Sequence, residues 1–473
     1  MVATLFGRAH DSSFNPTGHH EMNTQQHHCI RRLINRFIAP FGVACVFFSM
    51  SLAVAATSKK QTLPQWPSYQ QKKSLNALLS YAHTHNPSLL RLKKMLAVYK
   101  HKEQQVAAWP DPMLGVKGTN FPMPSFDPTQ TAMSGITYSV SQRFPISGRL
   151  SLQKTLASYN TALVKAAMRE KEHWLSFALH EALHNLRDLR QALTIEHQLY
   201  HLTEQAASVA RTKYTVNRAP QQHVFQAQTA LSSIRERMVI LLSKAQIWQH
   251  KLSRVLGHTK TTFYALPPAP QFKTLLTETQ VLTRAHKQRG QIQRLHILSK
   301  QAKQLLALSK ARYWPDLTVE LSVRQRFRNP VDTGAPFISL GLKLPIPTLG
   351  NSGREGLSKE AMARHQWAQK RIQELHTSYR TQAAILRTRI ALYKKQLDIA
   401  TKHTLPLARQ TYRATLQQYQ VDKSDFLTLL SNLQTMYIEI RKIQKLRTKR
   451  YIALERLHAL AGDLSLTHKR RTK

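Results

Sequence analysis

Two hydrophobic periods occur along this chain of 473 residues. Apolar and polar residues alternate one by one in four segments, 113–118 (more weakly), 136–144, 317–324 and 337–344. A period of two over such lengths predicts β-strands with one apolar and one polar face. The loops within each pair of segments are rich in Pro, Gly, Asn and Asp, as turns require. We therefore expect two β-hairpins, at about 112–144 and 316–345, and four strands per chain.

The rest of the pattern predicts very long helices. Residues 149–219 contain neither glycine nor proline, and a helix of about 65 residues would be about 95 Å long. The next helix has apolar residues at alternating spacings of four and three, which predicts a coiled-coil seam. Its seam positions are Ala227, Leu231, Ile234, Met238, Leu241, Ala245, Trp248, Leu252 and Val255. We expect long helix pairs at 150–256 and 357–461, with a kink at Pro406, where one backbone bond is lost.

The chain also repeats itself. Trp109-Pro110-Asp111 recurs as Trp314-Pro315-Asp316, and RFPI (143–146) recurs as KLPI (343–346). Segment 213–228 matches 418–433, and Gly257 and Gly462 close the two copies. Landmarks in the same order at nearly constant spacing indicate an internal duplication. The chain then divides into an N-terminal extension with signal peptide (1–55), a linker (56–73), a first repeat (74–257), a second linker (258–273), a second repeat (274–462) and a basic tail (463–473).

The extension has the features of an export signal. Arg31, Arg32 and Arg36 precede an apolar run that ends in the small residues 53–55, a typical cleavage pattern. Both cysteines of the chain, Cys29 and Cys45, lie before that point, so the mature chain would have no disulfide. Two alternatives stay open: translation from Met22, and lipoprotein cleavage that acylates Cys45.

The charge of the chain is extreme, at +44. Removing residues 1–55 takes four of the 69 basic residues and two of the 25 acidic ones, which leaves +42. Such a charge predicts attraction to polyanions, but export argues against nucleic acid. The charge then has two equally supported explanations. The basic residues could line an internal channel and favour anions there, or they could face anionic lipid headgroups.

One motif suggests catalysis. His180, Glu181 and His184 have the spacing H-E-x-x-H of zinc peptidases. A third ligand is needed, and Glu204 has the usual separation, but on a continuous helix it lies about 30 Å away. We therefore expect no catalytic residues, no cofactor and no metal, and we place both imidazoles on a solvated or lumen-facing helix surface. An exported helical zinc metallopeptidase is the alternative function.

Alternating strands in an exported chain favour an outer-membrane barrel. A membrane barrel must close, because an open sheet edge leaves backbone groups unsatisfied in hydrocarbon. Four strands cannot enclose a pore for solutes, so several chains must contribute, and three chains would supply twelve strands. The long helices would continue the barrel as a tunnel across the periplasm. The expected fold is therefore mainly α, a coiled-coil barrel with a small membrane β part.

The chain resembles the TolC-like outer-membrane efflux proteins, and among them the CusC/CzcC branch. The resemblance spans about 75–462 and rests on the duplicated order of WPD, RFPI or KLPI, and the turn stretches after 213 and 418. It implies a homotrimer in the outer membrane of a Gram-negative bacterium that forms the exit duct of a tripartite efflux or secretion system. The implied partners are a periplasmic adaptor, an inner-membrane transporter of the resistance-nodulation-division type, and outer-membrane lipid. Metal ions and drugs are both open as cargo.

By resemblance, the two turns between the long helices contact the adaptor. Their residues are Val216, Asn217 and Arg218 in the first repeat and Val421, Asp422 and Lys423 in the second. The family usually has glycine where Asn217 and Asp422 stand, and Asn and Asp tolerate the left-handed backbone that such a turn needs. The alternative is that these residues only cap helices.

The resemblance also gives candidates for a periplasmic gate. A well-known member has two aspartates after the second turn, and the matching positions here are Thr428 and Ser431, with Asp425 one turn earlier. This departure speaks against an acidic gate that filters cations.

Overall fold

A computed structural model describes residues 63–67, 74–259, 266–267, 274–331, 333–346 and 351–463. All of them belong to one compact unit, Thr62–Lys473. The expected leader with Cys45 and Met22 lies outside the described residues, as do residues 464–473 of the basic tail and most of both linkers.

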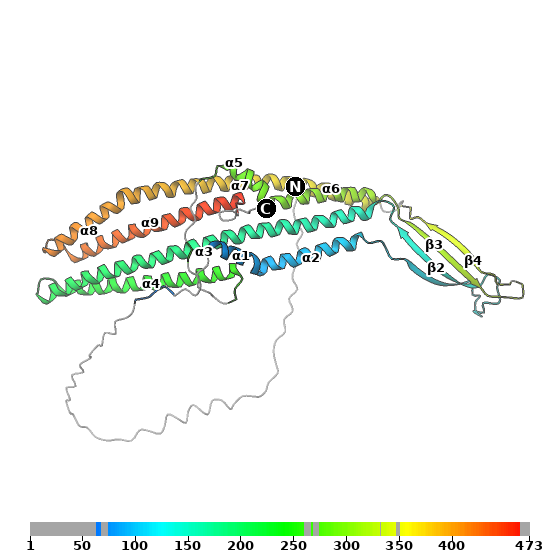
Figure 1. Ribbon diagram of the computed structural model, residues 1–473, viewed down its shortest axis with the longest axis horizontal. Helices are drawn as coiled ribbons and strands as arrows, with labels where there is room; N and C mark the ends of the chain where they lie inside the picture. Colours follow the sequence, from blue (N-terminus) through cyan, green and yellow to red (C-terminus); the bar gives the residue numbers. More distant parts are fainter. Residues whose placement is uncertain are drawn as a thin grey trace, which may run out of the picture. The chain divides into compact units, whose positions relative to one another are not determined.

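The two halves of this unit repeat one order of elements (Figure 1). The first half contains α1 (Leu75–His85), α2 (Pro87–Ala107), β1 (Met113–Thr119), β2 (Gly135–Phe144), α3 (Arg149–Thr215) and α4 (Gln221–Leu256). The second half contains α5 (Glu278–Gln288), α6 (Gly290–Ala311), β3 (Leu317–Arg326), β4 (Phe337–Lys343), α7 (Asn351–Ile399), the π-helical turn η1 (Ala400–Thr404), α8 (Leu405–Gln420) and α9 (Phe426–Ala461).

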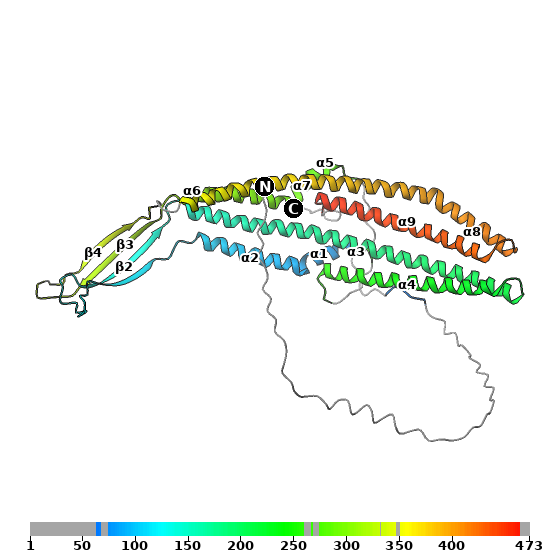
Figure 2. The ribbon, with the colours of Figure 1, turned by 180° about the vertical axis from the view of Figure 1, so that it is seen from behind.

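The long helices lie side by side, with the sheet at one end and the α3–α4 and α8–α9 turns at the other (Figures 1 and 2). Helix α3 has 67 residues, which corresponds to a length of about 100 Å. The predicted seam of α4 is its inner face, because Ala227, Ile234, Met238 and Leu252 are all buried. Helix pairing therefore follows the spacing of apolar residues. None of the described helices combines the length and the hydrophobicity needed to cross a membrane.

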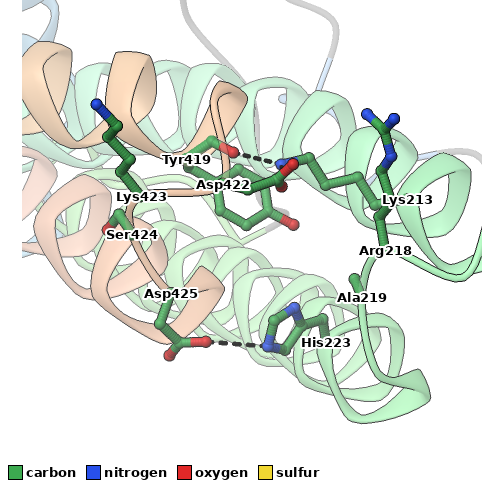
Figure 3. A pocket seen from close by; sticks show the side chains of 9 residues that line it. All are labelled: Lys213, Arg218, Ala219, His223, Tyr419, Asp422, Lys423, Ser424 and Asp425. Carbon is green, nitrogen blue, oxygen red and sulfur yellow. Dashed lines mark hydrogen bonds and ion pairs between the residues drawn. The ribbon is translucent and has the colours of Figure 1, made fainter.

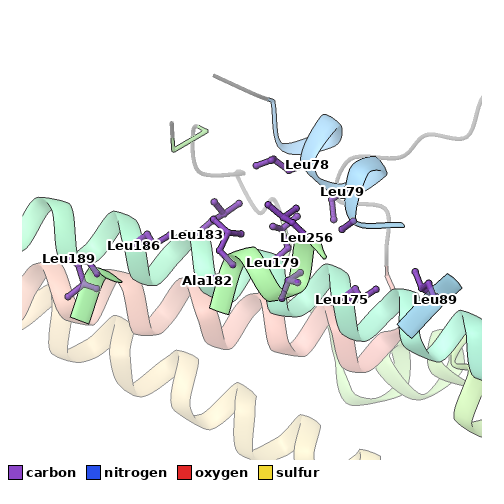
Figure 4. Packing of buried hydrophobic residues seen from close by; sticks show 14 residues of the cluster. Leu78, Leu79, Leu89, Leu175, Leu179, Ala182, Leu183, Leu186, Leu189 and Leu256 are labelled. Atoms are coloured by element: carbon purple, nitrogen blue, oxygen red, sulfur yellow. The ribbon is translucent and has the colours of Figure 1, made fainter. Parts of the chain in front are cut away.

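The core is divided into separate clusters along the helices. One cluster packs α1 against α3 and α4, and Figure 4 shows Leu78 of α1 near Leu179 of α3 and Leu256 of α4. A second cluster joins α5, α7 and α9. Further clusters bind α3 and α4 to α8 and α9 toward the turns. The two halves are thus held together by contacts distributed along the helices.

The four strands form one antiparallel sheet in the order β1-β2-β3-β4. The two hairpins join through β2 and β3, where Val140 lies opposite Leu321 and Tyr138 opposite Val323. Strands β1 and β4 each pair with one neighbour within the described chain, so their outer edges carry backbone groups without a strand partner.

The helix interruption near Pro406 differs in form from the expected kink. The π turn η1 comes immediately before α8, and Pro406 lies in the first turn of α8. The amide of Leu405 bonds to the carbonyl of Ala400, five residues back. The wider turn accommodates the proline, which has no amide hydrogen to donate.

Candidate functional site: the sheet face and the helix tips

One face of the sheet is apolar and exposed across all four strands. The register aligns two rows of apolar side chains, Leu114–Val140–Leu321–Leu340 and Val116–Tyr138–Val323–Ile338. Leu114, Ile338 and Leu340 are 83%, 76% and 71% exposed. A contiguous exposed patch of this kind marks a surface that contacts another molecule or a lipid phase.

The opposite face is mainly polar, although it also carries Met113 and Phe337 at its two edges. A row of Gly115, Ser139, Ser322 and Ser339 runs between the two apolar rows, on the other side of the sheet. In a further polar row, the Nε of Arg324 donates to the Thr137 hydroxyl at 3.2 Å. The sheet therefore separates an apolar surface from a polar one, as the alternation in sequence predicted.

The two turns at the opposite end from the sheet, 216–218 and 421–423, are called here the tip turns. Asn217 and Asp422 have φ angles of 61° and 60°, in the left-handed region. Each turn closes with a bond over five residues, from the Arg218 amide to the Lys213 carbonyl at 2.7 Å and from Lys423 to Gln418 at 2.8 Å. Asn217 and Asp422 therefore adopt the left-handed backbone conformation that the turns need.

The two tip turns are linked by charged side chains that line an open pocket of about 360 Å³ (Figure 3). The ammonium of Lys213 donates to the Asp422 carboxylate and to the Tyr419 carbonyl, and it lies 4.3 Å from the centre of the Tyr419 ring. A second ion pair joins the Nε2 of His223 to the Asp425 carboxylate at 2.9 Å. Each pair connects the α3–α4 helices to the α8–α9 helices.

Electrostatics at the tips favours the paired state. The hydrogen bond from Lys213 holds the pKa of the Asp422 carboxyl below its usual value, and the charges of Lys213 and Arg218 act in the same direction. Burial raises the pKa of the Tyr419 hydroxyl, and Asp422 and Asp425 add to the increase.

The remaining candidates are also at this end. Val216, Arg218, Val421 and Lys423 are exposed at the tip turns. Asp425 accepts from the Leu427 amide at 3.0 Å and so caps α9, in addition to its pair with His223. Thr428 and Ser431 are exposed on the first turns of α9.

Lys213, His223 and Tyr419 were not predicted. Tyr419 is the counterpart of Tyr214 in the repeat, but Lys213 corresponds to Gln418. The ion pairs thus join positions that are not equivalent in the two copies, so the repeat gave no signal for them.

The predicted location of the H-E-x-x-H residues is corrected by the structure. His180 and His184 are 5% and 4% exposed, so the expectation that they lie on a solvated or lumen-facing helix surface is wrong. They face Glu455 of α9, which is 4% exposed. Glu204 is exposed on α3 and pairs with His201 instead. The acidic group beside the two imidazoles therefore comes from α9 and not from α3.

Solved structures of outer-membrane proteins have a fold similar to that of this chain. The outer-membrane channel OprN matches with a TM-score of 0.69 at 13% identity, over 84% of this chain and 93% of that one. The outer membrane protein VceC from Vibrio cholerae matches with 0.67 at 16% identity, over 82% and 96%. CusC, described in connection with transmembrane channel formation, matches with 0.66 at 14% identity, over 85% and 95%.

This chain has the fold of an outer-membrane channel. The TM-score to CusC is no higher than the TM-score to OprN, so the fold does not single out the CusC/CzcC branch. No family model and no curated protein matches the sequence. The outer-membrane channel fold therefore occurs here at sequence identities of 13–16% to these solved structures.

Proposed function

We propose that this chain is the outer-membrane channel-tunnel of a tripartite efflux or secretion system, through which solutes pass from periplasm to exterior without any chemistry. The observation that carries the proposal is the exposed apolar face of a sheet whose other face is polar. The fold that the chain shares with the outer-membrane channel OprN and the outer membrane protein VceC supports the proposal.

The sheet gives a physical reason for assembly. Transfer of the exposed side chains of Leu114, Ile338 and Leu340 from water into hydrocarbon is favourable. It stabilises the protein by about 25 cal/mol per Å² of apolar surface removed from water. In the same place, the free edges of β1 and β4 would cost several kcal/mol for each unsatisfied backbone group. Pairing β1 of one chain with β4 of the next removes both edges. A homotrimer with a barrel of twelve strands, four from each chain, is the proposed assembly.

The helix tips are the proposed contact with a periplasmic adaptor. They carry exposed Arg218 and Lys423 beside exposed Val216 and Val421, which is a surface of small apolar patches bordered by positive charge. An adaptor with acidic residues around an apolar groove would complement it. An inner-membrane transporter of the resistance-nodulation-division type is the proposed source of energy.

The test is a charge reversal at the tips in a strain that lacks the native channel. The double variant Arg218→Glu, Lys423→Glu should abolish efflux and release the adaptor in co-purification, while the trimer in the outer-membrane fraction stays intact. Lys244→Glu is the control, since Lys244 is exposed on α4 about 40 Å from the tip. Unchanged efflux in the double variant would refute docking at the tips, and recovery of the wild-type chain as a water-soluble monomer would refute the channel itself.

A further inference from the structure

A buried cluster of three titratable side chains connects the two halves of the chain. His180 and His184 are one helical turn apart on α3, and Glu455 approaches them from α9. The Oε1 of Glu455 lies 2.9 Å from the Nδ1 of His180 and 3.6 Å from the Nε2 of His184. The exposed fraction of each residue is 5% or less.

The carboxylate oxygen in this cluster is in ion-pair contact with both imidazoles, but its hydrogen-bond geometry to them is poor. Despite its two close nitrogen neighbours, Oε1 of Glu455 makes no hydrogen bond of normal geometry with any described residue. A buried carboxylate oxygen without such a bond costs free energy, and a cation can compensate that cost.

The spacing of the three atoms suits a small divalent cation. Two ligands bound tetrahedrally to Zn²⁺ at about 2.0–2.1 Å are separated by about 3.3 Å. The two separations lie on either side of that value, and one ligand atom from each of the three residues lies within 4.8 Å of the other two. Two imidazoles and one carboxylate favour zinc over magnesium or calcium, which prefer oxygen ligands only.

We propose that His180, His184 and Glu455 form a structural Zn²⁺ site that fastens α3 of the first half to α9 of the second. The neighbours of the ligands belong to the two large core clusters, with Leu179 and Leu183 in one and Ala453 and Leu457 in the other. The ion would act at the seam between these clusters. A peptidase role does not follow, because a substrate cannot reach ligands that are buried to this degree.

The guanidinium of Arg187 should weaken zinc binding at His184. Its Nη1 lies 3.3 Å from the Nδ1 of His184, and a guanidinium can only donate, so Nδ1 accepts and the proton of neutral His184 is on Nε2. Zinc at Nε2 moves that proton to Nδ1 and displaces Arg187, which retains its bond to the Pro267 carbonyl. Removing the guanidinium should therefore strengthen zinc binding.

The experiment uses the mature protein purified in detergent and freed of metal with a chelator. Titration with Co²⁺, monitored by its visible absorption, and competition with Zn²⁺ should give one tetrahedral site per chain. Glu455→Gln and His184→Gln should weaken zinc binding at least about 100-fold, because loss of an outer partner alone costs about 10- to 100-fold. Arg187→Met should strengthen it.

The chain provides a matched control in a second histidine cluster. The Nδ1 of His286 on α5 lies 3.3 Å from the Nε2 of His376 on α7. The double variant His286→Gln, His376→Gln should leave the buried site unchanged.

Zinc should also raise the unfolding temperature of the wild type and of this control, but not that of Glu455→Gln. Absence of a stoichiometric site, or a site lost in the control and kept in Glu455→Gln, would overturn the proposal. The readouts need no transport, so they are independent of the channel function.

Discussion

Lys213 is the residue at which the tip contacts converge. It donates to Asp422 and Tyr419 and lies over the Tyr419 ring, so one side chain on α3 holds the turn between α8 and α9. Loss of that link should let the two helix pairs separate more often at the tips. Among the described residues of the tip pocket, the pair between His223 and Asp425 would then be the remaining ion pair in direct contact.

The first prediction concerns this link. Lys213→Met should raise the conductance of the purified channel in planar bilayers severalfold, because three copies of the pair would be lost together in the proposed trimer. Lys442→Met is the control, since Lys442 pairs with Glu439 three residues away on the same helix and joins no helix pairs. Equal conductance in the two variants would show that Lys213 does not restrain the tips.

The second prediction is a dependence on pH. The pKa of Asp422 is lowered in the folded chain by the Lys213 hydrogen bond, so the pair contributes its full stability above the ordinary value of 3.8. That contribution is lost as pH falls through the lowered pKa, below 3.8. Acid-induced opening through this pair should therefore begin only below that value, and Asp422→Asn should remove the step. A step near neutral pH that disappears in Asp422→Asn would contradict the assignment.

At the scale of elements, α6 is attached to α3 by backbone contact. Gly290 opens α6, and a Cβ there would overlap the Ala166 carbonyl oxygen and lie 2.8 Å from the Glu170 amide nitrogen. Glu170 also accepts from the Gln291 amide at 3.2 Å and from Arg289. The first turn of α6 thus obtains its cap from α3.

Gly290→Ala should accordingly destabilise the protein by about 1–3 kcal/mol, because the added methyl forces the two helices apart. Gly356→Ala is the matched control inside α7, where a Cβ meets nothing within 4 Å. That change should stabilise the helix by about 0.5–1 kcal/mol. Thermal unfolding in detergent checks both values, and the same shift in both variants would exclude a close α3–α6 contact.

The sheet gives a prediction for neighbouring residues on opposite faces. Leu340→Arg places a charge on the apolar face and should cost about 2–4 kcal/mol near the middle of a bilayer. Ser339→Arg, one residue earlier on the polar face, should cost much less. Folding into lipid vesicles, followed by heat-modifiable electrophoretic mobility, measures the difference. Equal costs would show that the Leu340 face does not contact lipid.

At the scale of the whole molecule, the high net positive charge predicts which ions the protein conducts. The mature chain would retain +42 of the +44. If much of that charge lines the tunnel, the field favours anions, and the reversal potential across a salt gradient in planar bilayers should show anion selectivity. Clear cation selectivity would instead place the basic residues against anionic headgroups outside the lumen.

The fold class could be predicted because its signals are local. The alternation in 136–144 and 317–324 predicted strands that the structure has as β2 and β3, and the spacing of Ala227, Ile234 and Met238 predicted the buried seam of α4. The backbone of Asn217 and Asp422 was predictable as well, since a left-handed turn limits the residues it accepts. The π turn before Pro406 was not, because a proline indicates an interruption but not its form.

The side-chain contacts of the candidate sites depend on pairs far apart in sequence. Lys213 and Asp422 are 209 residues apart, and the distance from His184 to Glu455 along the chain is larger still. The sequence alone determined period, helix length, turn conformation and the repeat, because each depends on neighbours along the chain. Only the tertiary structure decided which faces meet. The sequence of α3 contains no information on which helix would pack beside His180, and that packing turned an apparent surface motif into a buried link between the two halves.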